Sequence, residues 1–121
     1  MDDSRASRAR LHILNGRFEG TSYDLDDREI MIGRSLTTNI TLLDEGISRD
    51  HALVLFEEHE SAYMIEDLAS TNGTKLNGKH VRSAALSEGD GIQIGQTLFR
   101  FEIAKPDRDS PDRLRSTPMS G

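Results

Sequence analysis

Hydrophobic and polar residues alternate along several short stretches of this chain. In residues 29–33, Ile30 and Ile32 share one face of an extended segment, and residues 61–67 alternate in the same way. A period of two is typical of a half-buried β-strand. Residues 51–58 instead contain a continuous apolar run of strand length, which we expect to enter the core. No segment keeps the spacing of an amphipathic helix, so the pattern predicts an all-β protein.

The last patterned segment predicts a hairpin. Its bulky residues occupy even positions before Gly95-Gln96 and odd positions after it, namely Ile92, Ile94, Phe99, Phe101 and Ile103. This change of parity requires a turn or a bulge at the glycine.

Turn signals recur at short intervals along the chain. They are Asn15-Gly16, Asn72-Gly73, Asn77-Gly78 and residues 88–91, and glycine and asparagine accept a positive φ at little cost. Many short strands at this spacing predict an antiparallel β-sandwich or barrel. In such folds, the functional residues usually lie in loops at one end of the sheets.

The length of 121 residues suits one domain with short tails, which we place at residues 10–103. Residues 1–9 lack apolar periodicity, and residues 104–121 carry all three prolines with alternating charge. We expect a flexible N-terminal tail and a disordered C-terminal tail.

The composition excludes several classes of function. The formal net charge of -6 argues against a general nucleic-acid binder, because phosphate-backbone affinity needs clustered Lys and Arg. There is no cysteine, no signal-peptide pattern and no apolar run long enough to cross a bilayer, so we expect a cytoplasmic protein without a membrane partner. Any anionic ligand would need a local basic pocket.

Four loop segments carry candidate chemistry: residues 33–35 (GRS), 48–51 (SRDH), 70–74 (STNGT) and 76–78 (LNG). Together they supply two guanidinium groups, several hydroxyls and asparagine amides. These groups donate the charge-assisted hydrogen bonds that phosphate or carboxylate oxygens accept. The loops therefore predict anion recognition.

The order of these four segments, with Asp67 just before the third and LSEGDGIQIG at residues 86–95 after the fourth, resembles the motif order of the forkhead-associated (FHA) domain. The resemblance covers roughly residues 10–103. It implies a β-sandwich of about eleven strands whose loops at one end bind phosphothreonine in an extended peptide. The implied partner is a threonine-phosphorylated protein in Ser/Thr kinase signalling, with a Ser/Thr protein kinase as a candidate. No cofactor is implied.

The resemblance also assigns roles to individual residues. Arg34 would contact the phosphate, Ser48 and Thr71 would donate to it, and Asn72 would hydrogen-bond the peptide main chain. Arg49 lies at a variable position that often helps with phosphate or peptide contacts. The positions that shape loops and turns are Gly33, His51, Gly73, Asn77 and Gly78.

Other interpretations of these residues are weaker. Ser48, Asp50 and His51 could suggest a nucleophilic site, but three residues within four positions do not easily form a triad, so we expect no enzyme activity. The run at residues 57–60 (EEHE) fits a solvated hairpin tip better than a metal site. Asp67 is expected to cap loop amides.

Two further hypotheses keep the same fold. The domain could bind partners without phosphate, as an interaction or assembly module, in which case binding would survive loss of Arg34. Thr117 in the C-terminal tail, if phosphorylated, could occupy its own domain or a neighbour's at high effective concentration.

Overall fold

The computed structural model describes residues 8–25 and 29–104, and this part of the chain contains eleven strands and no helix. The strands are β1 (Arg8–Ile13), β2 (Ser22–Asp24), β3 (Ile30–Gly33), β4 (Ile40–Thr41), β5 (Ala52–Glu57), β6 (Ala62–Asp67), β7 (Thr74–Leu76), β8 (Lys79–Val81), β9 (Ser83–Ala85), β10 (Gly91–Ile94) and β11 (Thr97–Ala104).

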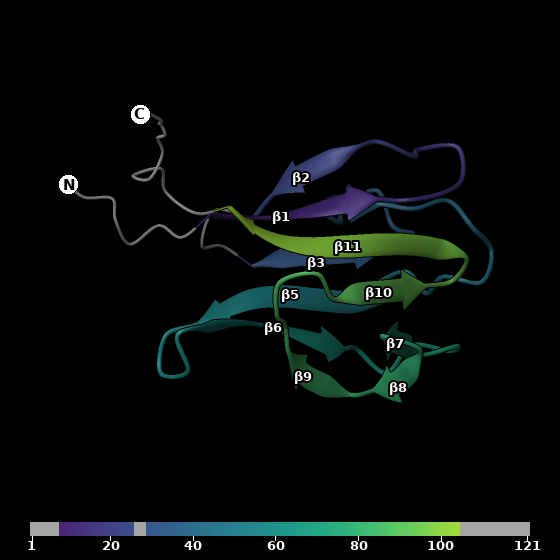
Figure 1. Ribbon diagram of the computed structural model, residues 1–121. Coiled ribbons are helices and arrows are strands. Elements are labelled where there is room, and N and C mark those ends of the chain that lie inside the picture. Colours follow the sequence, from purple (N-terminus) through teal and green to yellow (C-terminus); the bar gives the residue numbers. More distant parts are fainter. Residues whose placement is uncertain (1–7, 26–28, 105–121) are drawn as a thin grey trace, which may run out of the picture.

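The strands form two sheets that face each other (Figure 1). One sheet has the order β2-β1-β11-β10-β7-β8, and the other has the order β4-β3-β5-β6-β9. Neighbouring strands are antiparallel except for the short parallel pair of β3 and β4. The predicted sandwich is confirmed. No helix in the described residues is long and apolar enough to cross a membrane.

The core lies between the sheets and is built from alternate residues of each strand. Ile30 and Ile32 of β3 are buried, as are Ile92 and Ile94 of β10, so the period of two is confirmed there. Phe99 and Phe101 of β11 are fully buried, whereas Ile103 packs against the core only partly.

The expectation that the whole apolar run of β5 enters the core is wrong. Ala52 and Val54 are fully buried, but Leu53 is half-buried and pairs across the outer face with Met31 of β3 and Glu66 of β6. A strand in a two-layer sandwich has one face toward the core and one away from it, whatever its composition.

The expected domain boundaries need a small correction. β1 begins at Arg8 and Ala9 is buried, because this strand pairs along its length with β11, which ends at Ala104. The other residues of both predicted tails, including Thr117, lie outside the described residues.

The predicted hairpin at Gly95-Gln96 is confirmed. Ile94 pairs with Thr97, and Gly95 has a φ of 61°, as a tight two-residue turn requires. This turn lies at the end of the sandwich where β3 ends and β5 and β7 begin (Figure 1).

Candidate functional site

Backbone hydrogen bonds join the loop after β3 to the loop before β5. The Arg34 N–H donates to the Ser48 carbonyl at 3.0 Å, and the Ser35 N–H donates to the Arg49 carbonyl at 3.2 Å. Segments that are about fifteen residues apart in sequence are therefore held as one surface.

Gly33 makes this close approach possible. A Cβ at position 33 would lie 2.0 Å from the Arg49 carbonyl oxygen, which no side chain can tolerate without a backbone shift. Gly33 is buried at the end of β3, and its neighbour Arg34 is exposed.

Arg34 is anchored on one side only. Its Nε donates to the Ile47 carbonyl at 3.0 Å, and its two terminal nitrogens have no partner among the described residues. Ile47 is itself buried and packs against Gly95, where a Cβ would lie 2.6 Å from the Ile47 Cγ1. The guanidinium thus has a fixed base and an available fork of donors.

Ser48 and Thr71 meet although 23 positions separate them. The Thr71 N–H donates to the Ser48 Oγ at 2.9 Å, and the two hydroxyl oxygens lie 3.5 Å apart. This contact brings the 48–51 loop and the 70–74 loop together beside Arg34. Two of the expected hydroxyl groups are therefore neighbours in space.

His51 is fully buried and bridges the same two loops from beneath. Its Nδ1 accepts a hydrogen bond from the Ser48 N–H at 3.1 Å, so its Nε2 carries the proton donated to the Gly73 carbonyl at 2.8 Å. Both ring nitrogens are bonded to backbone groups and neither to the Ser48 hydroxyl. This arrangement lacks the serine–histidine hydrogen bond of a nucleophilic triad.

Asp67 organises the start of the 70–74 loop, and its predicted capping role is confirmed. It accepts hydrogen bonds from the Ser70 N–H at 3.1 Å, the Ser70 hydroxyl at 2.6 Å and the Thr74 hydroxyl at 2.8 Å. Partial burial alone would raise the pKa of Asp67, but the hydrogen bonds from Ser70 and Thr74 together hold it below its ordinary value. The carboxylate is therefore kept charged as a loop brace.

Asn72 extends the surface away from Thr71. Its side-chain N–H donates to the Gly46 carbonyl at 2.8 Å, and the side chain remains exposed. Gly73 follows with a φ of 86°, a conformation that favours glycine. Asn72 is thus held in place at the rim, and the rest of its exposed amide is available for other hydrogen bonds.

Arg49 lies next to this cluster but is less constrained. Its backbone carbonyl accepts from Ser35, whereas its exposed guanidinium has no partner among the described residues. The structure therefore brings Arg34, Ser48 and Thr71 into one cluster and leaves Arg49 at its edge.

Asn77 and Gly78 belong to a different region. Both have positive φ, as the tight turn between β7 and β8 requires, and Asn77 donates to Asp90 at 2.9 Å. Their contacts secure the turn and the 87–91 loop rather than the cluster around Arg34.

The sequence did not reveal which backbone groups anchor the site. The Ile47 and Gly46 carbonyls hold Arg34 and Asn72, and no residue type signals a backbone acceptor. Lys75 and His80, which border Asn72 in one hollow, were also missed because strands of three residues are too short for periodicity to be seen.

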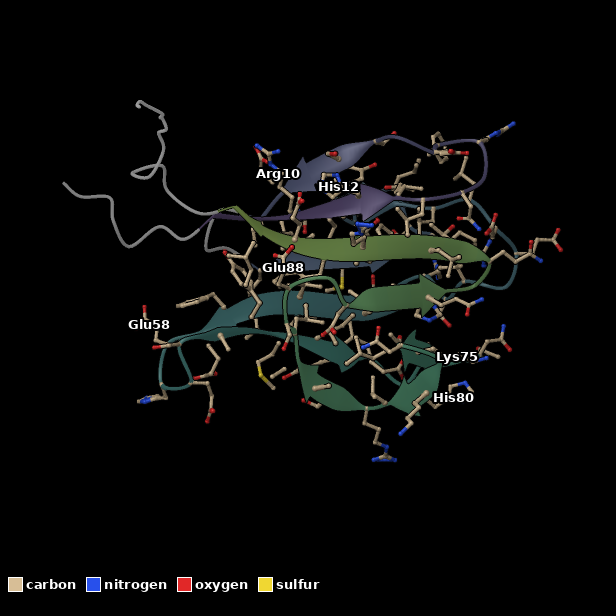
Figure 2. All side chains as sticks on the ribbon, in the orientation of Figure 1. Arg10, His12, Glu58, Lys75, His80 and Glu88 are labelled. Carbon is tan, nitrogen blue, oxygen red and sulfur yellow. The ribbon has the colours of Figure 1, made fainter. Side chains whose placement is uncertain are left out.

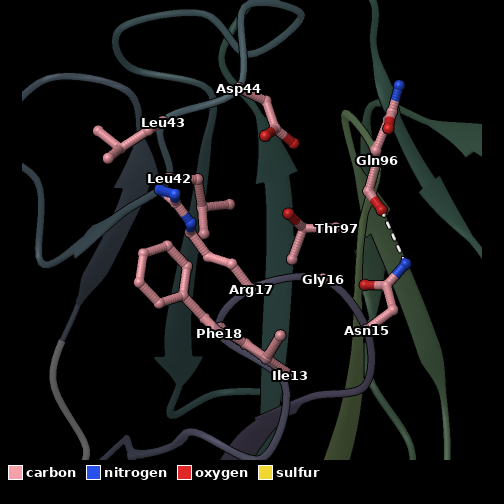
Figure 3. A pocket seen from close by; sticks show the side chains of 10 residues that line it. All are labelled: Ile13, Asn15, Gly16, Arg17, Phe18, Leu42, Leu43, Asp44, Gln96 and Thr97. Atoms are coloured by element: carbon pink, nitrogen blue, oxygen red, sulfur yellow. Dashed lines mark hydrogen bonds between the residues drawn. The ribbon is translucent and has the colours of Figure 1, made fainter.

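A hollow of about 310 Å³ lies nearby (Figure 3). Phe18 and Leu43 line one side, and Asn15 donates to the Gln96 carbonyl at 3.0 Å on the other. None of the expected binding residues lines this hollow. The cluster around Arg34 is an exposed loop surface rather than a deep cavity.

The expected hairpin tip at residues 57–60 is confirmed, because β5 and β6 pair up to Glu57 and Ala62 and the residues between them form the turn. Within residues 8–25 and 29–104, no group of three or more His, Asp or Glu side chains could hold a metal ion.

The sandwich and its loop cluster of guanidinium, hydroxyl and amide groups define an all-β protein with a loop surface rich in hydrogen-bond donors. The FHA domain family model matches residues 30–95, more than half of the chain. The chain therefore belongs to the FHA family.

Individual relatives agree with this assignment. The chain is 36% identical over 93 residues to an oxoglutarate dehydrogenase inhibitor of Corynebacterium jeikeium, covering 77% of this chain and 63% of that protein. It is 34% identical over 102 residues to the glycogen accumulation regulator GarA of Mycolicibacterium smegmatis, covering 84% and 63%. The chain thus spans less than two thirds of the length of these relatives.

A solved structure has the same fold. It comes from an analysis of phosphothreonine-dependent FHA domain interactions and superposes with a TM-score of 0.74 at 28% identity, covering 83% of this chain and all of that chain.

Proposed function

We propose that this chain is a phosphothreonine-dependent peptide- and protein-binding module that acts as an adaptor or regulator in Ser/Thr kinase signalling. The observation that carries the proposal is the Arg34 guanidinium, anchored through Nε on the Ile47 carbonyl with its terminal nitrogens available, on a loop that is hydrogen-bonded to Ser48 and through Ser48 to Thr71. The relatives named as an inhibitor and a regulator, and the structure from work on phosphothreonine-dependent interactions, support the same function.

The chemistry of the site matches a phosphorylated side chain. A phosphothreonine carries about -1.5 to -2 charges near neutral pH and three strong acceptor oxygens. Arg34 supplies two terminal nitrogens, and Ser48 and Thr71 supply neighbouring hydroxyl groups on the loops joined to it. In a chain of net charge -6, these donors and the nearby Arg49 concentrate positive potential where the anion binds.

Asn72 is proposed to hold the peptide main chain. Its donor to Gly46 fixes the side chain at the rim, and an amide retains further donor and acceptor capacity there. A main-chain contact adds affinity for an extended peptide without selecting particular side chains.

The proposal includes a threonine-phosphorylated protein partner, a cytoplasmic location and no catalytic activity. The last point is supported by His51, whose ring nitrogens are both bonded to backbone groups. A phosphate-independent interaction module is the alternative, and the same experiment separates the two.

The test is the affinity of the full chain for phosphothreonine peptides, measured by calorimetry with phosphoserine and unphosphorylated peptides as controls. Arg34→Ala is expected to weaken binding at least about tenfold, because hydrogen bonds to charged groups contribute about 1.5–3 kcal/mol. Arg100→Ala is the matched control, since Arg100 is exposed on β11 opposite Gly91 and His12. Binding that ignores phosphorylation and survives Arg34→Ala would establish the alternative.

A further inference from the structure

A second hollow borders the cluster around Arg34 at Asn72. It has a volume of about 250 Å³ and is lined by Asn72, Gly73, Lys75, His80, Gln93 and Gly95. No carboxylate is among these six residues. Two of them, Asn72 and Gly73, belong to the loop that also carries Thr71.

Three strands build the floor of this hollow. Lys75 of β7 pairs directly with His80 of β8 on one side and with Gln93 of β10 on the other, so the three side chains form one cross-strand row. Directly opposed side chains in antiparallel strands have Cβ atoms about 4.5–5.5 Å apart. Figure 2 shows Lys75 and His80 side by side at one end of the sandwich.

Gly73 lets the row approach the binding loop. A Cβ at position 73 would lie 2.7 Å from the His80 Cδ2 and 3.1 Å from its Nε2, so the imidazole rests directly against the loop. His80 therefore lies beside the short segment that contains Asn72 and Gly73.

The polar groups of this row are available to a ligand. Neither the Lys75 ammonium group nor the His80 imidazole makes a hydrogen bond or ion pair with another described residue. Gln93 is held against the wall because its side-chain N–H donates to the Gly95 carbonyl at 3.2 Å. An ammonium group and an imidazole N–H on one small surface are donors suited to an anionic group.

The opposite side of Gly95 has the reverse charge. Asp44, Glu45, Gly46, Gly95 and Gln96 line the adjoining hollow, and the Asp44 Oδ2 would lie 3.8 Å from a Cβ at Gly95. Asp44 and Glu45 would repel an anion on one side of Gly95, and Lys75 would attract it on the other.

We propose that Lys75 and His80 form an accessory subsite for an anionic group, a carboxylate or a second phosphate, on a residue flanking the phosphothreonine. The inference rests on the proposed function and deepens it, since it defines the partner as a phosphothreonine segment with an acidic or doubly phosphorylated flank. Lys75 supplies a positive charge, and His80 supplies an imidazole N–H donor and lines one side of the hollow.

The experiment uses phosphothreonine peptides with alanine flanks, in which each flanking position in turn is changed to Asp, phosphoserine or Lys. At one position, Asp is expected to tighten binding to the wild-type chain about two- to fivefold, as an exposed ion pair does, and phosphoserine to tighten it further. A gain from Asp that phosphoserine does not exceed would identify a carboxylate ligand, and a larger gain from phosphoserine than from Asp would identify a second phosphate.

Three variants assign the gain to this subsite. Lys75→Met removes the charge and keeps the side-chain length, so the gain should disappear. Lys75→Glu should reverse the preference, so that the Lys peptide binds more tightly than the Asp peptide. Lys79→Met is the matched control, because Lys79 is exposed and pairs with Leu76, one position away from the row, so the gain should remain. Thermal unfolding of each variant verifies that it is folded.

The outcomes separate the two proposals. If the alanine-flanked phosphothreonine peptide binds but no anionic position gains affinity, or if the gain survives Lys75→Met, the subsite is wrong and the phosphothreonine function stands. If no phosphothreonine peptide binds at all, both proposals are wrong.

Discussion

The buried His51 ring donates from Nε2 to the Gly73 carbonyl at 2.8 Å and accepts at Nδ1 from the Ser48 N–H. One imidazole therefore sets the distance between the loop that carries Ser48 and the loop that carries Thr71. The hydroxyl groups proposed to bind phosphate depend on a residue that does not face the ligand.

Replacing this bridge should lower both stability and affinity. His51→Ala leaves the partly buried Ser48 N–H and Gly73 carbonyl without their partner and empties the fully buried position of the imidazole, and an unpaired buried group costs about 1–3 kcal/mol. We expect the free energy of unfolding in urea to fall by at least about 2 kcal/mol, with weaker phosphopeptide binding. His59→Ala, at the exposed turn between β5 and β6, is the control and should change neither quantity. An unaltered affinity in folded His51→Ala would contradict the bridging role.

Gly33→Ala should be more damaging than an ordinary glycine substitution. The new Cβ would lie 2.0 Å from the Arg49 carbonyl, so the 48–51 loop has to move away from Arg34. We expect a lower melting temperature and a loss of phosphopeptide binding. Gly91→Ala is the matched control, because its nearest contact, the Asn77 Oδ1, is 3.6 Å from the Cβ position. Equal behaviour of the two variants would refute the steric argument.

Asp67 should make the protein less stable as the pH falls into the acid range. Because its pKa is lower in the folded state than in the unfolded chain, its contribution is fully present above the unfolded value and is lost as the pH falls through the folded value. Asp67→Asn should therefore destabilise the protein at neutral pH and differ less from the wild type below about pH 4. Urea unfolding at several pH values measures this difference in the free energy of unfolding, with Asp50→Asn as the control. A difference between Asp67→Asn and the wild type that stays constant with pH would disprove the linkage.

The two faces of β5 should respond differently to truncation. Val54→Ala creates a cavity in the core and should cost about 2 kcal/mol of unfolding free energy. Leu53→Ala removes a larger side chain but from the half-buried outer face, where the site can fill with solvent. We expect the loss per removed methylene group to be larger at position 54. Chemical denaturation of the two variants decides this; a larger loss per methylene at position 53 would place Leu53 in the core after all.

Phosphopeptide binding should weaken as ionic strength rises, because the proposed contacts of the exposed Arg34 and the half-buried Lys75 with the ligand would lie at the surface and be screened by salt. It should also weaken below about pH 6, where the phosphate takes up its second proton. Titrations at increasing salt measure the first effect. Affinity independent of salt would argue for a binding mode dominated by apolar contacts.

Several elements were readable from local pattern. Ile30 and Ile32 indicated β3, and the parity change at Gly95-Gln96 indicated the hairpin of β10 and β11, because both signals depend only on neighbouring residues. Four of the short strands, β4, β7, β8 and β9, gave no periodic signal of their own. Their ladder partners define them.

The sequence by itself determined the strand-forming periodicity, the turn positions and the residue types of the FHA loop motifs. Only the tertiary structure decided that Leu53 faces outward, that the Ile47 carbonyl anchors Arg34, and that Lys75 and His80 share a row beside Asn72. The physical reason is that strand pairing and loop contacts join residues distant in sequence. The face that a side chain takes, and the backbone atom that it meets, are properties of the partner strand or loop rather than of the local pattern.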